Sequence, residues 1–477
     1  MLVCADGHEA RSACYVFDMT GQSSRARFVW ECTILVSVFV VPLIFNPFAA
    51  LPFEPAKAQV VRGASILVCG MGLLRYFSPG RRRVLMVPRG VPSGGISLRR
   101  LLIASIAAYA GTLALATALS LNAVQSMWGL GDKHGAITTL CIMLFCLSVP
   151  HTIRIPSQMD RLLLTILSSS ALVSAYGVVQ FLGVDPLPWI TDSVSPVHST
   201  LGRSNYLGAY LALVLPFSLC LWLRAKRRFW PSVLIAALAT CLFVTQARAG
   251  WLAAVFACTF FTGMLGFRQR SQRGMGAAAA ISILGLALYF PLTSIRVQSY
   301  QSVTPPSQVQ SKGKSSSVVV PSVAEFSAVR QMSIQRRLII WRATLHLLDD
   351  RWLLGYGPEL FTVVFNTVYE PGSLYDGTDI LIDDPHNLFI DQFFATGVLG
   401  LLALLSVIAT FYALLWRELW RNADRDTQVV IATVMASASG FLIQAQFNPD
   451  VVTTTVFFWL LVTMALILGR RNFTEVR

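Results

Sequence analysis

Long apolar stretches with few or no charges alternate with polar segments along most of the chain. Uncharged stretches of roughly 17 to 25 residues are long enough to cross a bilayer as α-helices. The pattern predicts an all-α integral membrane protein with about 12 transmembrane helices. The predicted helices cover residues 32–48, 58–77, 101–121, 135–149, 162–182, 206–223, 229–245, 249–267, 274–293, a stretch within 388–415, 427–446 and 451–469.

One connection between the predicted helices, residues 294–387, is far longer than the others. Residues 297–327 are rich in Ser, Pro, Gln and Val without a helical period, which predicts a flexible insert. Residues 337–348 alternate charged and bulky side chains, which suits a helix lying in the membrane interface. The turn-forming run 349–358 would end that helix. This second part is therefore predicted to form a structured cap over the helix bundle.

The composition agrees with a bilayer environment. The chain is 55% hydrophobic and 13% charged, with a mean hydropathy of +0.60, whereas soluble domains are about 25% charged. The net charge of +14 comes largely from Arg and Lys clusters on alternate connections, at residues 81–100, 224–228, 268–273 and 417–425. The positive-inside rule places these clusters and both termini in the cytoplasm. Topology therefore accounts for the basic charge. Membrane lipids are expected partners, and nucleic acid is not.

This topology divides the chain into five parts. They are a cytoplasmic tail (1–28), transmembrane helices one to nine (29–293), a large periplasmic loop (294–387), transmembrane helices ten to twelve (388–469) and a second cytoplasmic tail (470–477). No cleavable signal peptide is expected. None of the nine cysteines lies in a predicted outer loop, so no disulfide framework and no cysteine-based metal site is expected.

The end of the long loop carries the most promising titratable group. His386 follows Asp383-Asp384-Pro385 and directly precedes the apolar run that begins after Asn387. Histidine is the side chain that changes its charge most readily near neutral pH, and here it would lie at a membrane surface. His386 is therefore the first candidate for proton transfer. The alternative is a structural role, in which its ring is hydrogen-bonded to a backbone carbonyl.

Three groups of residues occur in a fixed order along the chain. They are Ser199-Thr200-Leu201-Gly202-Arg203-Ser204-Asn205; then Arg248-Ala249-Gly250-Trp251; and then Arg337, Trp341, Asp350-Arg351-Trp352, Gly355-Tyr356-Gly357-Pro358, His386-Asn387, Gly397 and Gly400. In combination they resemble the signature region of the O-antigen ligase and polymerase superfamily, over a length that runs from about the first predicted helix to the last.

The resemblance implies a metal-independent glycosyltransferase of the GT-C type that needs no cofactor and works on the periplasmic face. Such enzymes take a glycan from an undecaprenyl-diphosphate carrier and pass it to a hydroxyl of a glycolipid or glycan acceptor. The reacting histidine and arginines of that family match His386, Arg248 and Arg203. Many relatives also carry an arginine shortly before the Ser-Thr-Leu-Gly turn, where this chain has residues 195–198, Ser-Pro-Val-His. Either Arg203 supplies that positive charge, or this part of the site differs from that of those relatives.

These residue types suit the chemistry independently of the resemblance. A lipid diphosphate gains negative charge as it leaves, and guanidinium groups can bind its oxygens through paired hydrogen bonds without titrating. A neutral His386 could take the proton of the attacking hydroxyl, with Asn387 or Asp384 orienting the ring. Further candidate substrate contacts are Asn387, Asn205, Arg337, Arg342 and His134. For Arg337 and Arg342, contact with lipid headgroups is the favoured alternative.

Other functions remain open at this stage. The acid pairs 349–350 and 383–384 suggest a metal site, but neither has His or Cys at ligand spacing, so no metal is expected. Twelve helices with both ends inside is also the layout of many secondary transporters, although no repeat relates the two halves. Within glycan transfer, ligation to the lipid A core is the first choice, ahead of polymerisation of repeat units and transfer to a protein hydroxyl.

Overall fold

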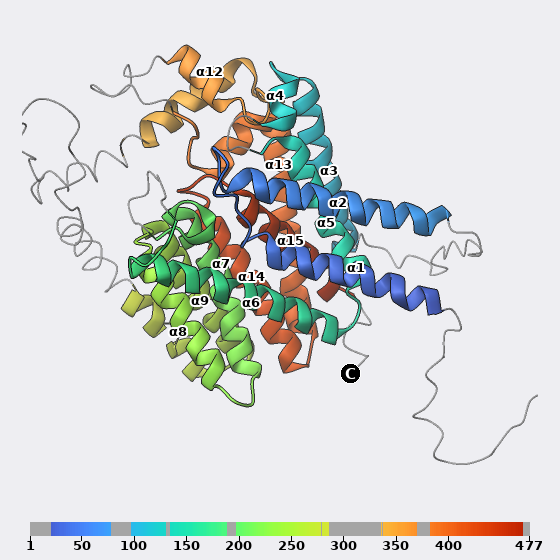
Figure 1. The fold of residues 1–477 in the computed structure, drawn as a ribbon, viewed down its shortest axis with the longest axis vertical. Coiled ribbons are helices and arrows are strands. Elements are labelled where there is room, and N and C mark those ends of the chain that lie inside the picture. The colour runs from blue at the N-terminus through green and yellow to red at the C-terminus, as the bar shows by residue number, and fades with distance from the viewer. Residues whose placement is uncertain are drawn as a thin grey trace, which may run out of the picture.

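The computed structural model describes residues 21–77, 97–129, 134–187, 197–277, 279–285, 335, 337–369 and 382–470. Within these residues the chain forms helices and turns, without a strand (Figure 1). The labelled α-helices are α1 (Gly21–Val40), α2 (Glu54–Phe77), α3 (Leu98–Ala118), α4 (Ala123–Trp128), α5 (Ala136–Thr152), α6 (Pro156–Phe181), α7 (Ser204–Arg224), α8 (Phe229–Val244), α9 (Arg248–Arg268), α12 (Phe361–Val368), α13 (Leu388–Arg421), α14 (Arg425–Gln444) and α15 (Val452–Leu468). Residues 272–277, 279–285 and 337–347 are also helical, and the 3-10 helices η2 (Ser199–Leu201) and η4 (Leu348–Asp350) complete the set.

The expectation of an all-α, multi-pass membrane protein is confirmed. In the described part of the chain, seven helices are long and apolar enough to cross a membrane, namely α2, α3, α6, α7, α9, α13 and α14, and shorter apolar helices occur in α1, α5, α8 and α15. Eleven of the twelve predicted segments overlap these helices. The ninth, residues 274–293, is helical as far as it is described, and its remainder lies outside the described residues. The count of twelve spans stays a prediction.

The first predicted helix is displaced. It was expected at residues 32–48, whereas α1 ends at Val40. Pro42 follows almost at once, and its ring disfavours continuation of a helix. Instead, the Pro42 carbonyl accepts a hydrogen bond of 2.5 Å from the Thr200 hydroxyl, which ties this turn to η2.

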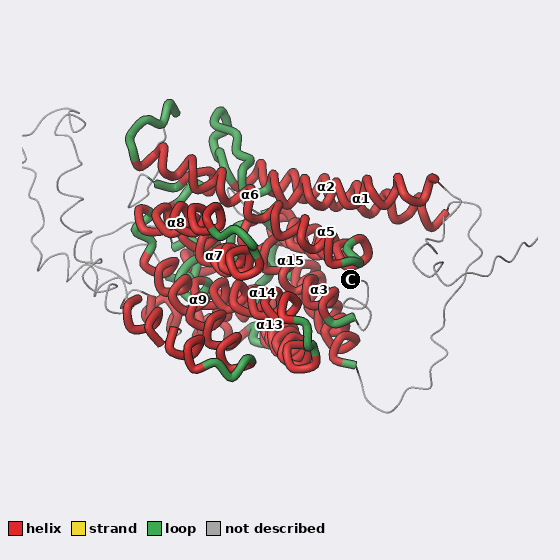
Figure 2. The backbone as a smooth tube through the Cα atoms, turned by 90° about the horizontal axis from the view of Figure 1, so that it is seen from below, coloured by secondary structure: helices red, strands yellow, loops and turns green. Residues whose placement is uncertain are grey.

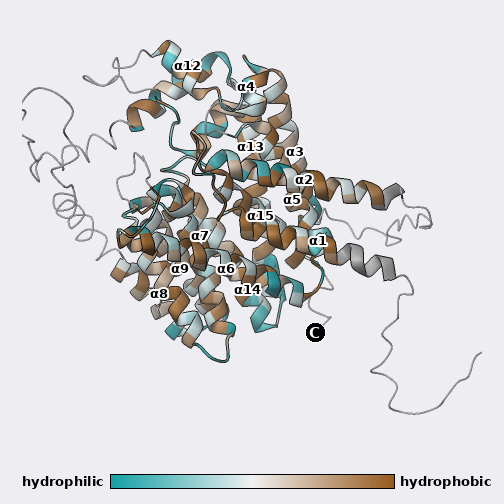
Figure 3. Ribbon diagram, in the orientation of Figure 1, coloured by the Kyte–Doolittle hydropathy of each residue, from teal (hydrophilic) through white to brown (hydrophobic). Residues whose placement is uncertain are grey.

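The helices differ in how deeply they are buried. Helices α7 and α14 are 72% and 78% buried over their most apolar windows, whereas α2 is only 33% buried and exposes side chains such as Leu67 and Leu74. Figures 1 and 2 show α1 and α2 side by side at the edge of the bundle. Figure 3 colours much of α2 as apolar, which together with its low burial inside the protein is expected for a helix that faces lipid.

The connections between helices gather at two ends of the bundle. At one end, which we call the basic end, Arg224 pairs with Asp160 at 2.8 Å and the Arg268 Nε donates to the Leu419 carbonyl at 2.9 Å. These residues belong to connections that the sequence places in the cytoplasm. Predicted inner connections therefore meet one another, as the expected alternation requires, while the side of the membrane that they face stays a prediction.

The predicted outer connections meet at the opposite end. The Lys57 ammonium, 0% exposed, donates to the Thr200 carbonyl at 2.9 Å and lies 3.4 Å from the Glu54 carboxylate. The same carboxylate accepts a hydrogen bond of 2.8 Å from the backbone N–H of Val452. This buried ion pair joins the start of α2, the turn at η2 and the start of α15. We call this the cap end.

The cap is the segment 337–369 of the long connection, and it is ordered into helices and turns as expected. That this connection is a periplasmic loop stays a prediction. The helix of the cap (337–347) ends in η4, as the turn residues predicted. The predicted insert 297–327 lies outside the described residues. The cap has its own small hydrophobic core, which includes Ile340, Leu347 and Phe365 and packs against Phe394 of α13.

Helix α13 is broken at Gly397, where φ is 65° and ψ is −169°. The cap segment that follows η4 lies along this break. The Tyr356 N–H donates to the Phe394 carbonyl at 2.9 Å, and the Val398 N–H donates to the Trp352 carbonyl at 2.8 Å. The backbone groups that the break releases from the helix are thereby paired, which makes irregular backbone tolerable in a membrane protein.

The predicted glycine motifs are explained by this junction. A Cβ at Gly397 would collide with the Leu353 carbonyl, and one at Gly355 would collide with the Phe394 carbonyl. Both glycines also have positive φ, which favours glycine. The sequence predicted a transmembrane helix within 388–415. The structure places a short helix, residues 388–396, beneath the cap, and the longer part of α13 follows the break at Gly397.

Candidate functional site

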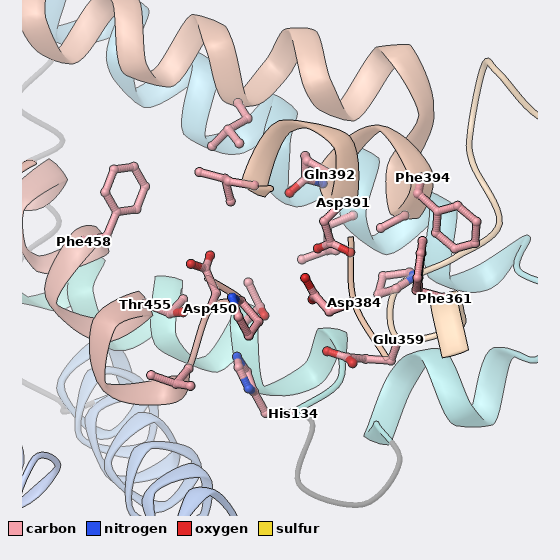
Figure 4. A pocket seen from close by; sticks show the side chains of 18 of the residues that line it. His134, Glu359, Phe361, Asp384, Asp391, Gln392, Phe394, Asp450, Thr455 and Phe458 are labelled. Carbon is pink, nitrogen blue, oxygen red and sulfur yellow. The ribbon is translucent and has the colours of Figure 1, made fainter. Parts of the chain in front are cut away.

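A cavity of about 150 Å³ lies at the cap end (Figure 4). Its walls come from α3, α13 (mainly residues 388–395), the start of α15, the α14–α15 turn and the cap. It combines aromatic and carboxylate side chains. The polar and aromatic lining residues are Glu54, Tyr109, His134, Thr139, Tyr206, Glu359, Phe361, Asp383, Asp384, Asp391, Gln392, Phe394, Phe441, Asp450, Thr455, Phe458 and Trp459.

The cavity is lined by acidic groups, whereas the sequence had drawn attention to arginines. Glu54 is engaged with Lys57, but Glu359, Asp384, Asp391 and Asp450 also face this space. Among the described residues that line the cavity there is no Lys or Arg. In the described part of the chain no three His, Cys, Asp or Glu side chains are arranged to hold a metal ion. The expectation of metal independence stays a prediction.

Asp450 is the most perturbed of these carboxyl groups. It lies in the turn between α14 and α15, and its Oδ1 is buried without a hydrogen-bond partner among the described residues. Burial, reinforced by the negative charge of Asp384, raises the pKa of Asp450 to about 7. Close to neutral pH this carboxyl therefore exists in both protonation states.

A hydrogen-bonded chain forms another part of the wall. The Tyr109 hydroxyl of α3 donates to the Gln392 Oε1 at 2.8 Å, and the Gln392 Nε2 donates to the Thr396 hydroxyl at 2.6 Å. The Thr396 hydroxyl in turn donates to the Gln392 carbonyl at 2.8 Å. These hydrogen bonds hold residues 388–396 of α13 against α3, just before the break at Gly397.

The structure places His386 in a tight turn immediately before α13. Its backbone N–H donates to the Asp384 Oδ1 at 2.5 Å, and its ring Nδ1 lies 3.5 Å from the same oxygen. The ring is 33% exposed. The indole of Trp341 donates to the Pro385 carbonyl at 2.7 Å, which connects the cap helix to this turn. The cap is thus hydrogen-bonded to the turn that carries His386.

Asn387 has a structural task. Its side-chain oxygen accepts hydrogen bonds from the backbone N–H groups of Phe389 and Ile390, at 3.0 and 3.2 Å, and so caps the N-terminus of α13. Asp384, and not Asn387, is therefore the neighbour that lies against the ring of His386. A substrate contact through the Asn387 amide nitrogen stays a prediction.

Arg248 and Arg203 begin two helices that pack closely together. Arg248 is the first residue of α9, and Arg203 precedes α7. A Cβ at Gly250 of α9 would lie 2.8 Å from the backbone carbon of Gly208 in α7, so these two glycines allow the helices to touch. The Arg203 guanidinium lies 5.8 Å from the ring centre of Tyr206, which lines the cavity. Both arginines thus lie at the cap end, and neither lines the cavity itself.

The remaining predicted residues are distributed around this region. The Arg337 Nη2 donates to the Phe447 carbonyl at 3.1 Å, in the same turn as Asp450. Arg342 and Asn205 are exposed. Of the eight residues predicted as site residues, all within the described part, His134 alone lines the cavity. The structure brings them to one end of the bundle but does not bring all of them to one pocket.

The carboxylates were largely missed by sequence reasoning. Asp391 and Asp450 lie far apart in the chain, and each is a single acid within or beside an apolar helix. A lone acid at a membrane-embedded helix end is itself a signal, because such a residue is costly unless it has a partner or a function. That signal points to both positions, although only the fold shows that they share a cavity.

The family model described as O-antigen ligase matches residues 233–405. The matched segment runs from α8 through the cap and ends in α13 shortly after the break at Gly397. It includes Arg248, Arg337, Arg342 and His386. Arg203, His134 and Asp450 lie outside it. No curated protein matches the chain. Residues 233–405 of this chain are therefore similar to the O-antigen ligase family.

Proposed function

We propose that this protein is a GT-C type glycosyltransferase that moves a glycan from an undecaprenyl-diphosphate carrier to an acceptor hydroxyl on the periplasmic face. The similarity of residues 233–405 to the O-antigen ligase family supports glycan transfer of the ligase or polymerase type. The observation that carries the proposal is the arrangement at the cap end. There the cap fixes His386 through Trp341, and the same end of the bundle carries Arg248 and a cavity.

Arg248 and Arg203 are assigned to the donor diphosphate. As the bond between the anomeric carbon and the diphosphate oxygen breaks, negative charge develops on the leaving group. Guanidinium groups fixed at helix ends stabilise that charge, and they remain protonated throughout. Arg337, held against the Phe447 carbonyl, is a third candidate for this contact.

His386 is assigned to the acceptor. Asp384, 3.5 Å from the ring Nδ1, favours the tautomer that carries its proton on Nδ1, which leaves Nε2 to take the hydroxyl proton. The acceptor oxygen then forms the new bond to the anomeric carbon, and undecaprenyl diphosphate departs. The reaction is balanced without a metal or a cofactor.

The proposed acceptor is the lipid A core, as in ligation. A strain that lacks the protein would then carry unsubstituted core together with free polymer. Single repeat units on the core would instead indicate a polymerase.

The reaction itself is tested with the purified protein in detergent, given a diphosphate-linked glycan and a core acceptor. Product that forms without a sealed membrane, and still forms after EDTA treatment, is the expected result. A transporter would form no product under these conditions. Activity that is lost in EDTA and restored by Mg²⁺ or Mn²⁺ would contradict metal independence.

A further inference from the structure

The charge of the cavity does not suit a diphosphate. Asp384 and Asp450 face it, and none of the described residues that line it is Lys or Arg. Like charges brought together in a partly desolvated space repel each other strongly, so this space disfavours an anionic ligand. The ligand that it fits is uncharged and rich in hydrogen-bond donors, because carboxylates accept hydrogen bonds.

The rest of the lining fits the same kind of ligand. Tyr109, Tyr206, Phe361 and Trp459 contribute aromatic surface. Binding sites for small molecules typically combine such apolar walls with a few convergent polar groups. A sugar ring offers both matching features, since it has an apolar C–H face and several hydroxyl groups.

Two polar atoms in the wall have no partner in the described part of the chain. They are the buried Oδ1 of Asp450 and the hydroxyl of Thr455, a residue that is 6% exposed. Both residues line the cavity, and Figure 4 shows them near each other, with Asp384 across the open space. Buried polar groups without partners are rare in native proteins and call for an explanation. A ligand that donates to Asp450 and bonds with Thr455 would satisfy both.

We infer that Asp450 and Thr455 form a subsite that binds hydroxyl groups of an uncharged sugar in this cavity, on the acceptor side of the transfer reaction. The assignment to the acceptor rests on the proposed function, whereas the binding of the sugar does not. The negative charge around the subsite excludes the donor diphosphate from it. The raised pKa of Asp450 agrees with a carboxyl that lacks a partner until a ligand supplies one.

Binding is tested with the full-length protein in detergent and maltotriose, a neutral hexose trisaccharide, by saturation-transfer NMR. The wild-type protein should transfer saturation to maltotriose and at least about five-fold less to a trisaccharide of uronic acids. Thr455→Val removes only the hydroxyl at nearly constant volume and should reduce the maltotriose signal at least about five-fold. Asp450→Leu should do the same.

Ser437→Ala is the matched control, because the Ser437 hydroxyl is also buried without a partner in the described residues but does not line the cavity. Its maltotriose signal should equal that of the wild type. Asp349→Leu, an exposed acid of the cap, controls for the loss of one charge. Absence of a signal with the wild type, or an undiminished signal with Thr455→Val, would overturn the inference and leave ordered water as the occupant.

Kinetics then separate this inference from the proposed function. Thr455→Val should raise the KM for the acceptor about five-fold or more and leave the KM for the donor unchanged. A wild-type protein that binds maltotriose but makes no product would contradict the proposed function and keep the subsite. A normal acceptor KM in Thr455→Val, with an active wild type, would remove the subsite and keep the function.

Discussion

The arginine-bearing starts of α7 and α9 and the acid-lined cavity occupy the same end of the bundle but carry opposite charge. Arg203 and Arg248 lie in the first, whereas Asp384, Asp391 and Asp450 line the second. A reaction that joins an anionic lipid to an uncharged sugar needs such a separation, because a single cationic pocket would also bind the donor in the acceptor position. Charge of opposite sign supplies this discrimination by repulsion as well as by attraction.

The two regions are also built differently. Helices α7 and α9 meet through Gly208 and Gly250, which place the two helix starts close together. The cavity instead depends on the break at Gly397 and on a cap segment that pairs with the released backbone groups. The arginines are thus held by regular helix packing, while the cavity is held by irregular backbone that requires glycine.

The largest effect is expected at the arginine region. Arg248→Ala should lower transfer by about 100- to 1,000-fold, since it removes a preorganised cation beside the leaving group. Arg248→Lys should recover little, because an ammonium does not replace the paired donors of a guanidinium. Arg421→Ala, an exposed arginine at the basic end, is the control. Product formed per unit time, normalised to inserted protein, is the measurement, and wild-type turnover in Arg248→Ala would remove this residue from the mechanism.

The junction between the two regions is tested at His386. This residue has φ of 55°, a backbone conformation that asparagine tolerates better than most residues. His386→Asn therefore keeps the turn, removes the titratable ring and should lower kcat by about 100-fold with little change in donor KM. Near-normal turnover of His386→Asn with an unchanged pH profile would show that His386 only positions the acceptor.

Asp450 allows the cavity to be tested through stability. Its pKa is raised from 3.8 to about 7, so between those values the folded protein keeps a proton that the unfolded chain has released. The stability associated with this carboxyl is therefore present below about pH 4 and is lost as the pH rises through about 7. Asp450→Asn cannot ionise and should be more stable than the wild type at pH 8, by about 1 to 3 kcal/mol.

Thermal unfolding in detergent at pH 4 and pH 8 measures this difference. The variant and the wild type should have similar midpoints at pH 4, and the variant should have the higher midpoint at pH 8. Asp349→Asn, an exposed acid of the cap, should show no such dependence. A wild type that is as stable as the variant at pH 8 would mean that Asp450 is well solvated or already paired.

The smallest effect is expected at the contact between the cap and the His386 turn. Trp341→Phe keeps the aromatic ring but removes the hydrogen bond to the Pro385 carbonyl. A loss of about 0.5 to 1.5 kcal/mol should lower kcat by roughly 2- to 10-fold. Trp352→Phe, an exposed residue of the cap, should not change kcat. If both variants were equally impaired, the cap would contribute general packing and would not position His386.

The helices could be predicted from the sequence because long uncharged runs leave few alternatives in a bilayer. The cap helix could also be predicted, since its charge pattern and the turn after it are local signals. The end of α1 was placed too late, although Pro42 marked it. The break in α13 could not be predicted, because Gly397 lies in an apolar run whose interruption depends on hydrogen bonds from the distant Trp352 and Tyr356.

The candidate site was less accessible to sequence reasoning than the fold. His386 stood out because a histidine at a membrane surface is unusual and its neighbours are polar. The cavity combines Tyr109, Asp391 and Asp450 from three separate helical regions, so that only tertiary packing reveals their proximity. Asn387 shows that a neighbouring position in the sequence can also mislead. Its place beside His386 suggested a substrate contact, whereas its oxygen caps α13.

The separation of the two charged regions is tested most directly by donor binding. The dissociation constant of a polyprenyl diphosphate is measured for the wild type, Arg248→Ala and Asp450→Leu, with the purified proteins in detergent. Binding should be at least about ten-fold weaker in Arg248→Ala and unchanged or tighter in Asp450→Leu. Unchanged binding in Arg248→Ala together with weakened binding in Asp450→Leu would contradict this separation.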